Sequence, residues 1–115
     1  MRYFDLLIER KKNRDKYLNN MDYYLKIIKE FFKKELGDVE IFLFGSFLRD
    51  DFGPNSDVDI LVISKNAPEN SHGKAKLVAK LKERIGFVNP FEFHIVTPEI
   101  YNEWYSFFIK EKKKI

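Results

Sequence analysis

Two aspartates, one residue apart, are the strongest sign of chemistry in this sequence of 115 residues. Asp57 and Asp59 begin the apolar run 57–63 (DVDILVI), which predicts a buried strand. Alternate residues of a strand point to the same face, so the two carboxylates are expected side by side, with their Cα atoms about 5–7 Å apart. Two ionised carboxylates at that spacing repel each other unless a cation lies between them. The pair therefore predicts a site for one or two Mg²⁺ ions, because Mg²⁺ prefers carboxylate and phosphate oxygens.

A Gly-Ser pair earlier in the chain adds a second half to this site. Gly45 and Ser46 follow the apolar run 39–44 (VEIFLF), which also predicts a buried strand. A strand that leads into Gly-Ser and a short helix exposes backbone N–H groups that suit a phosphate, and Ser46 can add its hydroxyl. Taken separately, the aspartates could be solvated and the Gly-Ser pair an ordinary turn. Together they offer phosphate donors beside metal ligands, which transfer of a nucleotidyl group from a triphosphate requires.

The rest of the pattern predicts one α/β (α+β) domain, with helices packed on a small sheet. Apolar residues at helical spacing predict a helix over 13–36 that stops at Gly37, a shorter one over 3–10, and polar residues 11–16 that either continue or interrupt it. Further elements are expected as helical turns over 47–51, a helix over 74–85, a strand over 91–96 and a last helix that starts at Thr97-Pro98-Glu99. We expect a single domain over 1–115, with its core at about 20–110, an N-terminal helical extension at 1–12 and a basic tail at 110–115.

The string 45–62 (GSFLRDDFGPNSDVDILV) resembles the signature of the DNA polymerase beta-like nucleotidyltransferases, which is Gly-Ser, ten residues, then Asp-x-Asp. It is most similar to the minimal nucleotidyltransferases, and the resemblance covers about residues 20–110. It implies a mixed sheet of three or more strands with helices packed on it. It also implies that Gly45 and Ser46 bind the triphosphate, while Asp57 and Asp59 are catalytic residues that bind Mg²⁺.

Two further positions match the same signature. Arg49 corresponds to a frequent arginine of the family, and it could contact phosphate or pair with Asp57 or a neighbouring carboxylate; we favour the structural pairing. Ser56 directly precedes the first aspartate and belongs to the expected nucleotide-binding set. The other acids of the stretch, Asp50 and Asp51, are expected to be solvated.

The third acidic position of the family is altered in this chain. It falls in the predicted strand 91–96 (FEFHIV), where His94 stands in place of the usual aspartate and Glu92 lies on the same face. We favour Glu92 as the third catalytic and metal-binding carboxylate. The alternatives are that His94 acts as a base or ligand, that it is a structural histidine, or that the catalytic set is incomplete.

The resemblance implies transfer of a nucleotide onto a hydroxyl of a partner protein or small acceptor. The nucleotide would be AMP from ATP, or the corresponding nucleotide from another NTP. Minimal nucleotidyltransferases are often encoded with a helical HEPN-type toxin, so the resemblance also implies an antitoxin role. The alternative is a catalytically weak module that binds nucleotide and neutralises or scaffolds a partner by contact. Template-directed or tRNA nucleotide addition is disfavoured, because the net charge is only +3 and the chain lacks room for domains that grip such a substrate.

Charge and composition bear on the kind of ligand and on the location of the protein. Residues 45–64 carry one Arg and four Asp, a net charge of −3, within a mildly basic chain, and this suits a site that collects cations and then a polyanion. The absence of cysteine excludes disulfides and thiolate zinc sites. No segment has the pattern of a signal peptide or a membrane span, so we expect a cytoplasmic location. Five aromatic residues at helical spacing near the C-terminus predict core or interface packing, with a homodimer or a docked partner as their use, or else stacking on a base (Tyr101, Trp104, Tyr105, Phe107 and Phe108).

Overall fold

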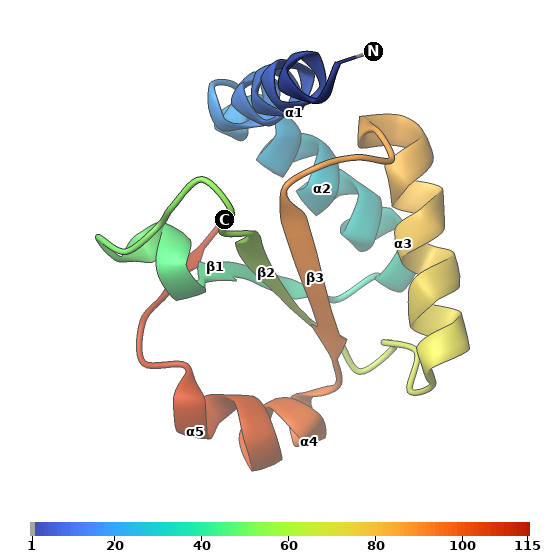
Figure 1. Ribbon diagram of the computed structural model, residues 1–115. Helices are drawn as coiled ribbons and strands as arrows, with labels where there is room; N and C mark the ends of the chain where they lie inside the picture. Colours follow the sequence, from blue (N-terminus) through green and yellow to red (C-terminus); the bar gives the residue numbers. More distant parts are fainter. Residues whose placement is uncertain (1) are drawn as a thin grey trace.

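A four-stranded mixed sheet lies at the centre of the molecule (Figure 1). The computed structural model describes residues 2–115. The strands are β1 (Glu40–Phe44), β2 (Val58–Ile63), β3 (Phe91–Val96) and β4 (Lys112–Lys114), in the spatial order β3-β2-β1-β4. The β2–β3 pair is parallel, and β1 is antiparallel to both of its neighbours, β2 and β4. The mixed sheet expected from the sequence is confirmed, and its three predicted strands lie within a residue of their expected bounds.

Side chains alternate between the two faces of the sheet along each strand, and different segments pack on each face. Val58, Ile60 and Val62 of β2 point into the larger core, which holds the long helices. Leu61 and Ile63 point to the opposite face and form a smaller cluster with Phe44, Val96 and the C-terminal helical segment. Asp59 shares this second face with Leu61, so the fold places the candidate chemistry on the side away from the long helices.

The first two helices correct a prediction. These helices are α1 (Tyr3–Leu18) and α2 (Met21–Leu36). The expected continuous helix over 13–36 is therefore wrong, and the polar run 11–16 belongs to α1. The break lies at Asn19 and Asn20, where the Asn20 backbone leaves the helical region and its side chain donates to the Lys16 carbonyl at 2.7 Å. Asparagine side chains compete with helical hydrogen bonds in this way, whereas apolar periodicity continues across the break and hides it. The predicted stop at Gly37 is confirmed, with a φ of +79°.

The remaining helical segments connect and follow the strands. The 3₁₀ turn η1 (Gly45–Leu48) leaves β1, and α3 (Ser71–Ile85) begins at the Asn70 cap, earlier than the predicted residue 74. After β3 the chain forms α4 (Pro98–Ile100), the π-helical turn η2 (Tyr101–Tyr105) and α5 (Ser106–Phe108), and these pack below the sheet in Figure 1. Thr97 caps this segment by accepting from the Ile100 N–H, as predicted. Within residues 2–115, every helix falls short of the length and apolarity that crossing a bilayer would require.

The expected basic tail is a strand in the structure. Residues 112–114 form β4 and pair with Phe42, Leu43 and Phe44 of β1. Three consecutive lysines have low intrinsic strand preference, so the sequence gives little sign of this strand. Lysine is nevertheless suited to a sheet edge because its charge discourages further strand pairing.

The buried hydroxyl of Tyr17 connects α1 to the end of α3. Tyr17 is 1% exposed and donates to the Ile85 carbonyl at 2.5 Å. We expect Tyr17→Phe to lower the free energy of unfolding by about 1–3 kcal/mol, because it leaves that carbonyl without its partner. Urea unfolding measures the change. The matched control Tyr23→Phe, at a residue that is 63% exposed, should stay within about 0.5 kcal/mol of the wild type; equal effects would contradict this account.

Candidate active site

The Asp59 carboxylate is fixed at the point where β1 and β2 pair. Phe44 ends β1 and lies opposite Asp59 in the antiparallel register, so Gly45 follows directly against the Asp59 side chain. Gly45 has a φ of +78°, a left-handed conformation that favours glycine. A Cβ at residue 45 would overlap Asp59 Oδ2 and lie 3.2 Å from Asp59 Cγ. A larger residue would strain the backbone and displace the Asp59 carboxylate, so the two halves of the sequence motif meet at this contact.

The parallel neighbour β3 adds two more ligand groups to Asp59. Glu92 lies opposite Asp59 in the register, and His94 is two residues further along the same face. His94 Nε2 is 3.2 Å from Asp59 Oδ1 and 3.8 Å from Glu92 Oε1. The side chains of Asp59 and His94 are each 22% exposed, whereas that of Glu92 is 55% exposed. The three residues therefore form one half-buried cluster with an open side at Glu92.

Aromatic side chains hold the imidazole of His94 in place. The Phe44 ring lies 5.0 Å from the His94 ring and the Tyr105 ring lies 5.8 Å from it, both edge-on. The Tyr105 hydroxyl is 3.4 Å from His94 Nδ1. Burial, and then the negative charge of Glu92, raises the pKa of this hydroxyl above its usual value of 10.0. Tyr105 therefore keeps its proton and can donate to, or accept from, the ring nitrogen that faces away from Asp59.

Asp57 lies outside this cluster. It precedes β2, is exposed, and borders a groove with Arg14 of α1 and the turn at Asn89 and Pro90. The backbone beside it is anchored, because the Val58 N–H donates to the Pro90 carbonyl at 2.7 Å. Among the described residues, Asp59, Glu92 and His94 form a group of three whose ligand atoms lie within 4.8 Å of one another.

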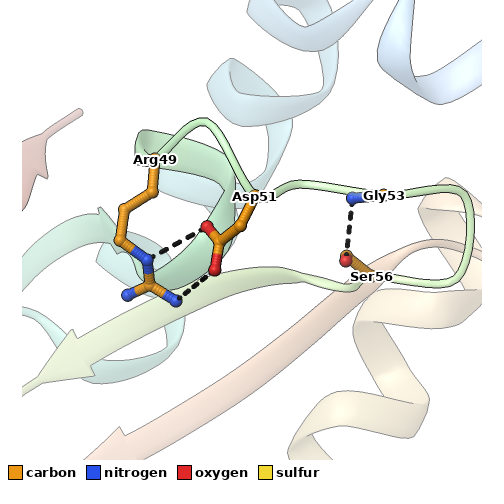
Figure 2. Close-up of polar contacts among 4 residues, drawn as sticks. All are labelled: Arg49, Asp51, Gly53 and Ser56. Carbon is orange, nitrogen blue, oxygen red and sulfur yellow. Dashed lines mark hydrogen bonds and ion pairs between the residues drawn. The ribbon is translucent and has the colours of Figure 1, made fainter.

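The loop between the two motif halves is closed by its own polar groups. Figure 2 shows Arg49 facing Asp51, with Nε–Oδ1 and Nη2–Oδ2 distances of 3.1 and 3.4 Å. This hydrogen bond from Arg49 lowers the pKa of the exposed Asp51 carboxyl. The Ser56 hydroxyl accepts from the Gly53 N–H at 3.0 Å, and Arg14 donates to the Ser56 carbonyl. Arg49 thus pairs with a neighbouring carboxylate, Asp51, which stays exposed as expected, and Ser56 closes the turn before β2.

A pocket of about 410 Å³ adjoins Gly45 at the end of β1. Arg49 and Lys110 supply positive charge to its wall against the single acid Glu111, and Phe44 and Phe108 supply apolar surface. Ser46 lies in η1 next to Gly45 and is half-buried. A volume of this order suits a small-molecule ligand, and the mixture of cations and aromatic rings suits an anionic one.

The donor set of the cluster fits a divalent cation. Two carboxylates and one imidazole each offer a ligand atom, and these atoms lie within 4.8 Å of one another. The sequence identified Glu92 and His94 as alternatives, whereas the structure brings both to Asp59. It missed Tyr105 as a site residue, because the contact depends on the π-helical turn η2, which residue periodicity does not reveal.

Comparisons with known proteins identify the family and the fold. The family model described as "Nucleotidyltransferase domain" matches residues 25–115. A solved structure described as a "putative nucleotidyltransferase" is 33% identical, with a TM-score of 0.64, and the match covers 79% of this chain and 96% of that one. A second structure of that description, from Sulfolobus solfataricus, shares the fold at 20% identity, a TM-score of 0.54, and coverage of 84% and 83%. No curated protein matches the chain.

Substituting Gly45 tests the contact on which the cluster rests. We expect Gly45→Ala to lower the free energy of unfolding by about 1–3 kcal/mol through the left-handed backbone. By displacing the Asp59 carboxylate, it should also weaken divalent-ion affinity by about tenfold or more. Urea unfolding and calorimetric titration with Mn²⁺ measure the two effects.

Gly53→Ala is the matched control for that substitution. A Cβ at Gly53 would only touch Ser56 Oγ at 3.8 Å, so both quantities should stay near the wild-type values. Wild-type ion affinity in Gly45→Ala would show that the close contact does not position Asp59.

Proposed function

The chain belongs to the nucleotidyltransferase domain family, and from this premise we propose that it transfers AMP from ATP onto a hydroxyl of a partner protein. The observation that carries the proposal is the cluster of Asp59, Glu92 and His94 beside Gly45, because it joins a divalent-ion site to the turn expected to receive a triphosphate. Mg²⁺ is the ion that the motif predicts. Asp57, two residues before Asp59, stays in the proposal as a second motif carboxylate near the ion.

The proposed reaction is an in-line displacement at the α-phosphorus of the triphosphate. The acceptor oxygen forms a new P–O bond, the bond between the α-phosphorus and the bridging oxygen breaks, and pyrophosphate leaves with that electron pair. A divalent ion, when bound, neutralises charge on the phosphate oxygens and on the reacting oxygens. Glu92 takes the hydroxyl proton in this proposal, because it is the most exposed of the three ligand groups. Asp59 and His94 hold and orient the ion together with the second carboxylate oxygen of Glu92.

We place the triphosphate in the pocket beside Gly45. The absence of a side chain at Gly45 lets the backbone approach a phosphate closely, and Ser46 offers a hydroxyl. Arg49 and Lys110 line the same pocket and complement the negative charge of the phosphates. Arg49 would leave or share its exposed pair with Asp51, which costs little because both groups are solvated.

We place the acceptor protein on the C-terminal helical segment 98–108. Trp104, Phe107 and Phe108 are 65%, 80% and 60% exposed, and Phe108 also lines the pocket beside Gly45. Aromatic side chains exposed in this way are characteristic of protein interfaces, and a partner docked on them would present its hydroxyl next to the triphosphate. A helical toxin of the HEPN type, with this chain as its antitoxin, is the partner that the family resemblance suggests. A second copy of this chain is the other occupant to test.

Loss of the central carboxylate tests the enzymatic proposal. We expect Asp59→Asn to lower transfer of label from ATP to the partner by about 100-fold or more. Asp57→Asn should have a smaller effect, because Asp57 lies outside the cluster. Asp38→Asn, an exposed acid just before β1 at the far end of the strand, should match the wild type. Electrophoresis of the partner encoded next to this gene, after incubation with labelled ATP and Mg²⁺ or Mn²⁺, measures transfer.

The same variant separates catalysis from simple contact. We expect Asp59→Asn to bind the partner with wild-type affinity in calorimetry, because segment 98–108 does not depend on the ion. Phe107→Ser should weaken that binding by about tenfold, since one exposed aromatic anchor contributes about 1.4 kcal/mol or more. Absence of label transfer, together with neutralisation of the partner by Asp59→Asn, would favour the non-catalytic binding module instead.

A further inference from the structure

The third position of the ion site offers nitrogen where an all-carboxylate site would offer oxygen. His94 Nε2 lies 3.2 Å from Asp59 Oδ1 and 3.8 Å from Glu92 Oε1. Adjacent ligands of a six-coordinate ion with bonds of about 2.1 Å are roughly 3 Å apart. The separation from Asp59 is close to that value and the one from Glu92 is longer, and ligand atoms of all three residues lie within 4.8 Å of one another. The imidazole is therefore one member of a compact donor set.

The orientation of the imidazole supports its use as a ligand. A metal-bound histidine presents one nitrogen to the ion and hydrogen-bonds through the other, and this second contact fixes the ring. In the structure the Tyr105 hydroxyl faces Nδ1 at 3.4 Å, which leaves Nε2 directed at the two carboxylates. Tyr105 comes from the π-helical turn η2, a rare irregularity that is frequent at functional sites.

From this donor set we infer that the site is selective for Mn²⁺ over Mg²⁺, with His94 Nε2 bound directly to the ion. Mg²⁺ prefers oxygen ligands, whereas imidazole nitrogen favours first-row transition ions. Mn²⁺ also retains affinity for carboxylate and phosphate oxygens, so it suits Asp59, Glu92 and a triphosphate together. The inference rests on the divalent-ion site of the proposed function and replaces its Mg²⁺. In this arrangement Tyr105 is a positioning residue that acts through His94.

Two measurements on the intact chain without nucleotide test the inference. Pulsed electron paramagnetic resonance of bound Mn²⁺ should detect a directly coordinated nitrogen. The chain has two histidines, and the one outside the site, His72, is exposed on α3. His72→Gln should therefore keep the nitrogen signal, while His94→Asp should lose it. Calorimetric titration should show that His94→Asp reduces the ratio of Mn²⁺ to Mg²⁺ affinity by about tenfold. Tyr105→Phe should weaken Mn²⁺ binding by about tenfold and retain the nitrogen signal.

The first two outcomes decide the inference without any assay of turnover. A wild-type Mn²⁺ complex that lacks a coordinated nitrogen would overturn the inference, even if His94→Asp failed to fold. An unchanged affinity ratio in a folded His94→Asp variant would overturn it as well. A coordinated nitrogen together with no transfer of label from ATP would refute the proposed function and leave the inference standing. Transfer with equal affinity for the two ions and no coordinated nitrogen would do the reverse.

Discussion

The close contact between Gly45 and the Asp59 carboxylate is the constraint on which the site depends. Gly45 adopts a left-handed φ at the end of β1, and a Cβ there would overlap Asp59 Oδ2. The antiparallel register that pairs Phe44 with Asp59 brings the two together. Because a one-residue slip of register would turn Asp59 to the other face, the larger core of β1 and β2 also fixes the carboxylate. Packing on one face of the sheet therefore determines chemistry on the other.

The mixed sheet explains how three separate segments converge on one point. An antiparallel partner brings the end of β1 to the start of β2, and a parallel partner brings the start of β3 to the same place. Asp59 consequently has Gly45 on one side and Glu92 on the other, with His94 one step along the face. The C-terminal segment then returns across that face and closes it with Tyr105. No pair of adjacent elements could supply all of these groups.

The sequence predicted the parts of the fold that depend on local pattern. The strands β1, β2 and β3, the stop at Gly37 and the cap at Thr97 follow from residue types at fixed spacing, and the structure confirms them. The break at Asn19-Asn20 was missed because apolar periodicity continues across it, and the strand of lysines 112–114 was missed because its pairing with β1 outweighs the local preference. Glu92 and His94 were competing alternatives in sequence, and only the parallel register shows that both reach Asp59. Tyr105 required the π-helical turn, which adds a residue to a turn that periodicity treats as regular.

The surroundings of His94 explain why an imidazole suits this position better than a carboxylate would. Phe44 and Tyr105 enclose the ring, and His94 is 22% exposed. A carboxylate placed between these two aromatic rings and beside Asp59 would lose hydration and meet a second negative charge, and both effects oppose ionisation. An imidazole carries no negative charge, packs edge-on against the rings and still offers a ring nitrogen to a cation. The aromatic enclosure and the histidine therefore belong together, and exchanging the residue alone would not recreate an all-carboxylate site.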